Sequence, residues 1–283
     1  MPTAKIIDGN KIAKSILETI KNKIKNMKEK PGLALVLVGN NPASEIYVNF
    51  KEKDSKEAGF YCERYNLDKG VSEMDLINLL NQLNNNSKIH GILVQLPLPK
   101  QIDEKLIINS ILPHKDVDGF TPLSLGNLMI ENTIMAPATA RAVISLIEST
   151  GIKIEGKNAV VIGRSSIVGK PVAMMLLEKN ATVTICHSMT KNLAEHTKKA
   201  EILVVAAGKP KLITKEMVMG GSIVIDVGIN RIGDKLIGDV DFENVKEVAG
   251  FITPVPGGVG PMTRAMLMDN TLKAMELAKK ILK

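Results

Sequence analysis

The sequence predicts an α/β protein of two domains, the second of them with a Rossmann-like pattern of strands and helices. Apolar runs of strand length, such as 33–39, 202–208 and 223–229, alternate with segments of helical periodicity, which is typical of parallel sheets. The chain has 283 residues, 45% of them hydrophobic, so it exceeds the usual length of one domain and can fill two cores.

The first half of the chain contains the first series of strands and helices. Asn41 is suited to cap a helix that begins at Pro42, and Gly59 is suited to end it. The expected elements, in chain order, are a helix over 12–28, a strand over 32–39, the helix from 42 to 59, a strand near 61–67, a helix near 72–83, a strand over 89–96 and a short helix around 104–111.

The second half begins a fresh α/β series after a helix over 140–150 that stops at Gly151. We therefore expect a first domain at 1–136, completed by a C-terminal helix over 262–283, and a second at 137–261 that includes the helix 140–150. The strands expected in the second domain are 157–162, 182–186, 202–206 and 222–227, with a glycine turn and a helix after the first of them.

Composition argues against several classes of protein. No apolar run approaches the roughly 18 to 20 residues that span a bilayer, and residues 1–14 lack the apolar core of a signal peptide, so we expect a cytoplasmic protein without a membrane partner. Cys62, Cys186 and four scattered histidines form no metal-binding pattern. The net charge is +7, but the lysines are dispersed and only 3% of residues are aromatic, so nucleic acid is not an expected partner.

A turn at 163–169 follows an expected strand and opens a helix, where backbone N–H groups can bind a pyrophosphate. Ser165 stands where G-x-G-x-x-G has its second glycine, so the segment alone fits an ordinary tight turn equally well. The end of the next strand, 186–190, has no carboxylate to hold a ribose 2′-hydroxyl. Arg164 and Ser188 can instead bind a 2′-phosphate, which favours NADP over NAD, although Arg164 can also be a plain surface residue.

Three other segments carry candidate catalytic or substrate-binding residues. Tyr47 and Lys51 fall on one helix face with Ser44 and Ser55, near the carboxyl edge of the sheet, although such a face can also simply be solvated. Gln95 interrupts an apolar run, so its amide either caps local backbone or points into a site. Asp118 lies in an acidic loop in which an Asx-turn is the alternative.

Five segments together resemble the methylenetetrahydrofolate dehydrogenase/cyclohydrolase family, in order and over essentially the whole chain. They are Tyr47-x-x-x-Lys51-x-Lys53, Gly91-Ile-Leu-Val-Gln-Leu-Pro-Leu-Pro99, Lys115-Asp-Val-Asp-Gly119, Gly163-Arg-Ser-x-Ile-Val-Gly-Lys-Pro171 and Pro254-Val-Pro-Gly-Gly-Val-Gly-Pro-Met-Thr263. One departure is that the family's usual Pro-Cys-Thr-Pro is here Pro137-Ala138-Thr139-Ala140.

The resemblance implies two α/β domains with a cleft between them, a folate on the first and NADP on the second, and a homodimer formed through the nucleotide domain. It implies that Lys51 is the catalytic lysine, that Tyr47 stacks on the folate, that Gln95 bonds to the lysine and that Asp118 anchors the pterin. The implied dinucleotide contacts are Gly163, Arg164, Ser165, Ser188 and Ile229, and the further folate contacts are Val94, Leu96, Pro256, Gly257, Gly258, Val259 and Gly260.

The activity implied by the resemblance is oxidation of 5,10-methylenetetrahydrofolate with NADP, followed by hydrolysis of the methenyl product to 10-formyltetrahydrofolate. A monofunctional dehydrogenase is the first alternative, and intact Lys51 and Gln95 argue against it. A second alternative is a non-catalytic folate or nucleotide sensor. A third is a Rossmann dehydrogenase for another small substrate, which would not need the segments 91–99 and 254–263.

Overall fold

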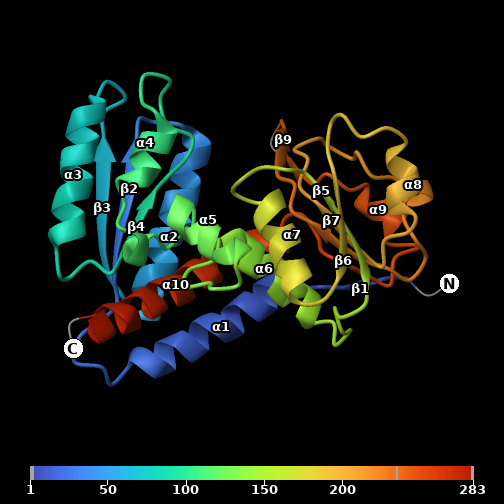
Figure 1. Ribbon diagram of the computed structural model, residues 1–283, viewed down its shortest axis with the longest axis horizontal. Coiled ribbons are helices and arrows are strands. Elements are labelled where there is room, and N and C mark those ends of the chain that lie inside the picture. The colour runs from blue at the N-terminus through green and yellow to red at the C-terminus, as the bar shows by residue number, and fades with distance from the viewer. Residues whose placement is uncertain (1–2, 234, 282–283) are drawn as a thin grey trace. The chain divides into compact units, whose positions relative to one another are not determined.

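A computed structural model of the chain describes residues 3–233 and 235–281 (Figure 1). The chain forms two compact units. The β2 unit comprises Lys14–Ala138 and the residues from Arg264 onward, and the β5 unit comprises the residues up to Ala13 and Thr139–Thr263. The boundary expected from sequence placed residues 1–136 together. The residues up to Ala13 instead group with the β5 unit, because β1 (Lys5–Ile6) pairs in parallel with β11 (Phe251–Ile252).

The β2 unit is built on a parallel sheet of β3 (Tyr61–Leu67), β2 (Gly32–Val38) and β4 (Gly91–Val94), in that order. Every residue of β2 is buried, so both faces of the sheet are covered. Alternate β2 residues, from Ala34 to Val38, pack in one apolar cluster with side chains of α3 (Glu73–Asn85) and α4 (Glu104–Asn109). Figure 1 shows α3 and α2 flanking this sheet.

Helix α2 (Pro42–Ala58) begins and ends where the sequence predicts. The Asn41 side chain accepts hydrogen bonds from the backbone N–H groups of Ala43 and Ser44 at 3.0 and 3.1 Å, and Gly59 ends the helix at φ 86°. Because α2 follows β2 directly, its first turns lie at the carboxyl edge of the sheet. The remaining elements of the β2 unit, in whole or in part, are α1 (Gly9–Ile24), the 3-10 turn η1 (Pro113–Lys115), α5 (Pro122–Met129) and α10 (Val259–Ile281).

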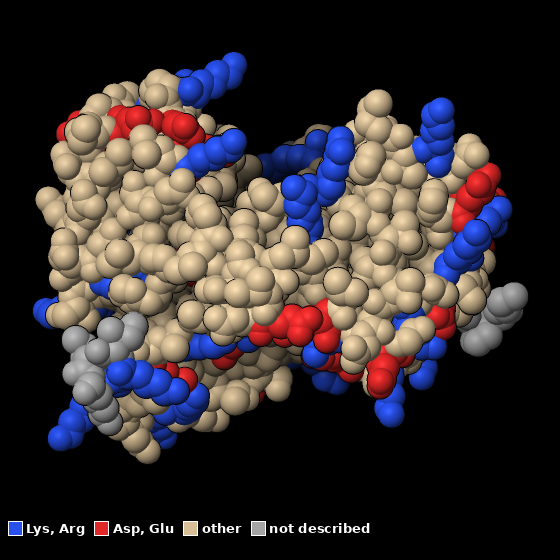
Figure 2. Space-filling view, viewed as in Figure 1, with Lys and Arg blue, Asp and Glu red and all other residues tan. Residues whose placement is uncertain are grey.

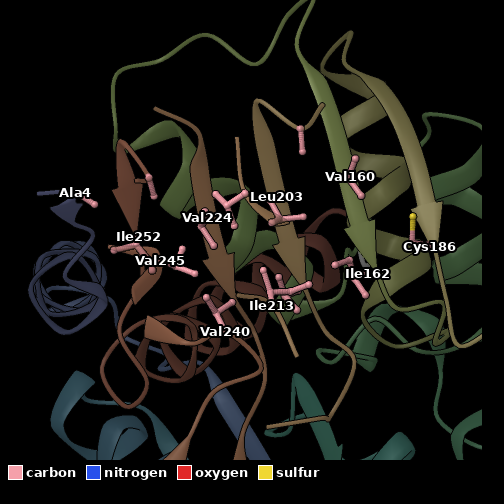
Figure 3. Close-up of a cluster of buried hydrophobic side chains, with 14 residues drawn as sticks. Ala4, Val160, Ile162, Cys186, Leu203, Ile213, Val224, Val240, Val245 and Ile252 are labelled. Atoms are coloured by element: carbon pink, nitrogen blue, oxygen red, sulfur yellow. The ribbon is translucent and has the colours of Figure 1, made fainter. Parts of the chain in front are cut away.

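The β5 unit is built on a second parallel sheet, with strand order β1-β11-β8-β7-β5-β6 among the described residues. Side chains of Ile252, Val224, Leu203 and Val160 lie across neighbouring strands in its core (Figure 3). The other elements are β5 (Asn158–Ile162), β6 (Thr182–Cys186), β7 (Ile202–Val205), β8 (Ile223–Asp226), the antiparallel pair β9 (Asn230–Ile232) and β10 (Lys235–Ile237), α6 (Ala138–Glu148), α7 (Gly169–Glu178), α8 (Leu193–Thr197), η2 (Lys215–Met217) and α9 (Phe242–Val245).

Figure 2 shows how the charged residues are distributed over one face of the molecule. On the face shown in Figure 2, lysine and arginine side chains stand in small groups among uncharged residues and form no continuous basic tract. Within the described ranges no helix has both the length and the apolarity needed to cross a bilayer. The same ranges contain no cluster of three or more histidine, cysteine, aspartate or glutamate side chains arranged to hold a metal ion.

Candidate active site

Lys51 and Gln95 meet at the carboxyl edge of the β2-unit sheet. Lys51 lies on α2, and its Nζ donates a hydrogen bond to Oε1 of Gln95 at 3.0 Å. The Gln95 backbone continues β4, since its N–H donates to the carbonyl of Val36 at 2.8 Å, and its side-chain Nε2 donates to the carbonyl of Leu96 at 2.7 Å. Gln95 therefore does both things that the sequence left open, because its amide nitrogen binds local backbone while its oxygen receives the lysine.

The loop before α5 presents Asp118 to the same lysine. The turn expected there is made by Asp116, whose carboxylate accepts hydrogen bonds from the N–H groups of Gly119 and Thr121 at 2.8 and 2.7 Å. The Ser124 hydroxyl also donates to it, at 2.8 Å. Asp116 is only 2% exposed, so it anchors the loop from inside. These backbone N–H groups bind Asp116 and not Asp118. Asp118 instead interacts electrostatically with Lys51.

Burial moves both of these charged groups toward neutrality. It lowers the pKa of Lys51, and the Asp118 charge opposes that change. Burial also raises the pKa of Asp118 to about 6, against the effect of Lys51. A lysine whose amine is neutral more readily than usual can accept and return a proton, which is a requirement of general acid–base catalysis near neutral pH.

The predicted polar face of α2 is largely covered. Ser44 and Ser55 are buried, while Tyr47 and Lys51 are half-buried, so this face is not the solvated one that the sequence also allowed. Burial raises the pKa of Tyr47, so its phenol stays protonated. The structure thus brings Tyr47, Lys51, Gln95 and Asp118 together in the β2 unit. Val94 and Leu96, which flank Gln95, are buried and half-buried.

The turn after β5 has the close backbone packing that a dinucleotide site needs. Gly163 has φ 127°, and a Cβ there would lie 2.3 Å from the carbonyl oxygen of Ala206. A Cβ on Gly169 would lie 2.2 Å from the carbonyl oxygen of Gly163. Oγ of Ser165 accepts hydrogen bonds from the N–H groups of Val168 and Gly169 at 3.2 and 3.3 Å, so it stabilises the turn that leads into α7.

The remaining predicted dinucleotide contacts lie at the same edge of the β5-unit sheet. Arg164 follows β5, Ser188 follows β6 and Ile229 follows β8, and the three side chains are exposed. Ile162 pairs with Cys186 in parallel strands. Arg164 and Ser188 each follow two residues later, so they leave the sheet from neighbouring strand ends. The separate segment Pro256, Gly257, Gly258, Val259 and Gly260 leads from β11 into α10, also in the β5 unit.

Sequence reasoning missed a pair of buried carboxylates beneath this edge. Oδ2 of Asp239 accepts hydrogen bonds from the N–H groups of Ala207 and Gly208 at 2.6 and 2.8 Å, and its Oδ1 accepts one from Nδ2 of Asn230 at 2.8 Å. Asp239 therefore joins the loops that follow β7 and β8. Asp226 accepts the N–H group of Asp239 itself, at 3.0 Å. The available signal was an acid at the end of the apolar run 223–226.

Comparison with known proteins identifies the family. Residues 7–118 match the family model described as tetrahydrofolate dehydrogenase/cyclohydrolase, catalytic domain, and residues 137–279 match the model for the NAD(P)-binding domain of the same family. The chain belongs to the tetrahydrofolate dehydrogenase/cyclohydrolase family. The two models divide the chain close to where the sequence changes from the first α/β series to the second.

Relatives match this member of the tetrahydrofolate dehydrogenase/cyclohydrolase family over almost its whole length. The bifunctional protein FolD of Moorella thermoacetica is 54% identical over 275 residues, which are 96% of this chain and 98% of that protein. The crystal structure of the bifunctional enzyme FolD from Campylobacter jejuni has a TM-score of 0.94 at 45% identity and covers 97% of this chain and 99% of its own. The Trypanosoma brucei enzyme, complexed with NADP and an inhibitor, has a TM-score of 0.96 at 37% identity and covers 99% and 100%.

The departure from the family pattern at Ala138 and Ala140 falls at the start of α6. Both alanines are buried, at 2% and 0% exposure. Between them Thr139 keeps a polar contact, since its Oγ1 lies 3.4 Å from Oγ1 of Thr263 in a hydrogen bond. The two alanines therefore occupy buried positions, and the hydrogen bond of Thr139 between them is retained.

Proposed function

We propose that this family member oxidises 5,10-methylenetetrahydrofolate to the 5,10-methenyl compound with NADP and hydrolyses that product to 10-formyltetrahydrofolate. The observation that carries the proposal is the 3.0 Å hydrogen bond between Lys51 and Gln95, with Asp118 interacting with the same amine. A monofunctional dehydrogenase would have no need of a lysine whose pKa burial lowers. The match to both family models and the bifunctional relatives support the same conclusion.

The dehydrogenase step requires positioning more than proton transfer. NADP, when bound, supplies the nicotinamide ring that accepts a hydride from the folate's methylene carbon. The residues of the β5 unit fit such a cofactor, because the Gly163 turn has no room for a Cβ and leads directly into a helix N-terminus. Gly163 and Ser165 would hold the pyrophosphate, Arg164 and Ser188 the 2′-phosphate, and Ile229 an apolar part of the cofactor. The NADP-bound Trypanosoma brucei relative supports this assignment.

The cyclohydrolase step requires proton movement at the substrate. A water oxygen bonds to the methenyl carbon, and the neutral amine of Lys51 accepts the proton that the water releases. One carbon–nitrogen bond of the ring then breaks as the added oxygen forms the formyl carbonyl. The Lys51 ammonium returns its proton to the departing nitrogen, and the remaining hydroxyl proton leaves to solvent as the net proton of the hydrolysis. Gln95 orients the amine without adding charge, because its oxygen accepts the lysine's hydrogen bond.

The remaining residues of the β2 unit bind the folate in this proposal. Tyr47 stacks on the substrate and Asp118 anchors the pterin, with Val94 and Leu96 providing contacts beside Gln95. The segment 256–260 provides a second set of folate contacts. The β2 unit is thus the folate-binding domain and the β5 unit the NADP-binding domain. We further propose that the enzyme acts in the cytoplasm as a homodimer, without a nucleic-acid or membrane partner.

A single spectrophotometric experiment tests the proposed function. Purified protein is mixed with methylenetetrahydrofolate and either NADP or NAD, and the absorbances of reduced nicotinamide and of the methenyl compound are followed together. We expect reduced nicotinamide to form faster with NADP, and methenyl absorbance to stay below the nicotinamide signal because it is hydrolysed. If the methenyl compound instead accumulates in equal amount to the reduced nicotinamide, and then decays no faster than it does in buffer alone, the result would favour the monofunctional alternative. No reduction of either cofactor would contradict the proposal.

A further inference from the structure

The face of α2 that carries Tyr47 and Lys51 also holds an arginine from α10. Phe50 and Asp54 lie three and seven residues after Tyr47, so both share its side of the helix, and Asp54, three residues after Lys51, is a neighbour of Lys51 on that surface. Nε of Arg264 donates to Oδ2 of Asp54 at 2.6 Å, and the Arg264 guanidinium lies over the Phe50 ring, 4.8 Å from its centroid. Two independent contacts therefore fix this side chain.

We propose that Arg264 is a positioning residue for the cyclohydrolase step, a fixed positive charge that Asp54 and Phe50 hold beside Lys51 so that the lysine amine is neutral when substrate binds. The inference rests on the proposed function of Lys51 as the group that accepts the water proton. Arg264 itself touches no reacting atom in this scheme, and it acts through its charge.

The charges around Lys51 oppose each other. Burial has the largest effect and lowers the pKa of Lys51. Asp118, from the loop before α5, raises it, and Arg264, from α10, lowers it with a smaller effect. Gln95, at the end of β4, is neutral, and Tyr47 on α2 stays protonated because burial raises its pKa. Arg264 thus partly offsets the effect that Asp118 has on the pKa of the amine. Without the guanidinium, the carboxylate would favour the ammonium form, which cannot accept a proton.

An arginine suits this task better than a lysine. Its planar guanidinium can donate through Nε and lie on an aromatic face at the same time, and it stays charged throughout the working pH range. Asp54 is only 8% exposed, and burial raises its pKa while Arg264 opposes that change. Asp54 and Arg264 therefore hold each other in place on the helix that carries Lys51.

The decisive measurement is the pKa of the Lys51 amine itself. In full-length protein labelled with carbon-13 at lysine Cε, the Lys51 resonance is assigned by its loss in Lys51→Met and titrated by NMR. Arg264→Gln keeps a side-chain N–H for Asp54 but removes the charge, so we expect the Lys51 pKa to rise by about half a pH unit. Arg264→Lys keeps the charge and should stay closer to wild type. Asp118→Asn should shift the pKa in the opposite direction.

Arg64→Gln is the matched control. Arg64 also pairs with α2, since its Nη1 lies 3.2 Å from Oε2 of Glu52, the neighbour of Lys51. It is not among the charges that shift the Lys51 pKa, so its removal should leave that pKa unchanged. Circular dichroism and thermal unfolding confirm that each variant is folded. An unchanged Lys51 pKa in folded Arg264→Gln, or an equal shift in Arg64→Gln, would overturn the inference.

The pH dependence of cyclohydrolase activity tests the role of Arg264 separately from the proposed role of Lys51 as the proton acceptor. In Arg264→Gln the acid limb of kcat/KM should move to higher pH by the same amount, which lowers the rate about threefold on that limb. If the NMR pKa moves and the acid limb does not, the coupling between Arg264 and Lys51 is supported but Lys51 is not the group that accepts the proton. That result would overturn the proposed mechanism and, with it, the role given to Arg264.

Discussion

The amine of Lys51 and the amide of Gln95 are hydrogen-bonded at 3.0 Å although 44 residues separate them in the chain. Each comes from a segment that begins or ends at the carboxyl edge of one parallel sheet, α2 after β2 and Gln95 after β4. The order of the strands therefore creates the contact on which the proposed cyclohydrolase chemistry depends.

Replacing Lys51 by methionine tests that chemistry directly. Lys51→Met keeps a long side chain on α2 but removes the amine, so cyclohydrolase activity should fall by about 100-fold or more. Dehydrogenase activity should fall less, because hydride transfer needs no proton donor. The measurement is hydrolysis of methenyltetrahydrofolate above the buffer rate, with NADP affinity and circular dichroism as controls for folding. A near-normal rate in folded variant protein would show that Lys51 is not the base.

Removing the Arg164 side chain should weaken the binding of NADP far more than the binding of NAD. One charge-assisted contact to a phosphate contributes roughly 1.5 to 3 kcal/mol, so Arg164→Ala should raise the KM for NADP by at least about tenfold. Ser188→Ala should act in the same direction with a smaller effect, since a neutral hydroxyl contributes about 0.5 to 1.5 kcal/mol. Initial rates with both cofactors give the comparison. Equal effects on NADP and NAD would place Arg164 away from the 2′-phosphate.

Changing Asp239 to asparagine should loosen the edge of the β5 unit. The new amide N–H₂ must face either the N–H groups of Ala207 and Gly208 or the amide nitrogen of Asn230, and each arrangement leaves buried donors unmatched. We expect a loss of about 1 to 3 kcal/mol in unfolding free energy, measured in urea, and a raised KM for NADP. Glu243→Gln, at an exposed position of α9, is the control and should change stability by less than about 0.5 kcal/mol. A variant as stable as this control would mean that the contacts of Asp239 carry little energy.

Asp226 should make part of the stability pH-dependent. Burial raises its pKa to about 6, opposed by hydrogen bonds from Val240, Asp239 and Gly228. Because the folded pKa lies above the unfolded one, this contribution is complete below about pH 4 and is lost as pH rises through 6. The difference in unfolding free energy between wild type and Asp226→Asn should therefore shrink over that range, by about 2 to 3 kcal/mol. Urea titrations from pH 4 to 7 measure it, and a constant difference would contradict the raised pKa.

Local features of the sequence were sufficient to predict most helices and strands. Asn41 and Gly59 bound α2 as expected, and β6 covers the predicted residues 182–186. The first helix instead covers Gly9–Ile24, a few residues before the predicted 12–28. These elements were predictable because capping, backbone φ and hydrophobic periodicity act over a few residues. The candidate roles of Lys51, Gln95 and Asp118 came from the family resemblance of five segments read together, because none of the three local signals was decisive by itself.

What only the tertiary structure decided is how distant segments pair. β1 is two residues long and exists because it pairs with β11, which lies at the other end of the chain. Asp239 stabilises two loops through hydrogen bonds to residues 9 to 32 positions away, and Arg264 reaches Asp54 across 210. No local sequence pattern predicts such contacts. A buried carboxylate is stable only beside hydrogen-bond donors, and those donors come together only when the chain has folded. The sequence alone thus indicated the candidate residues for the proposed chemistry, and the folded structure decided which charges surround them.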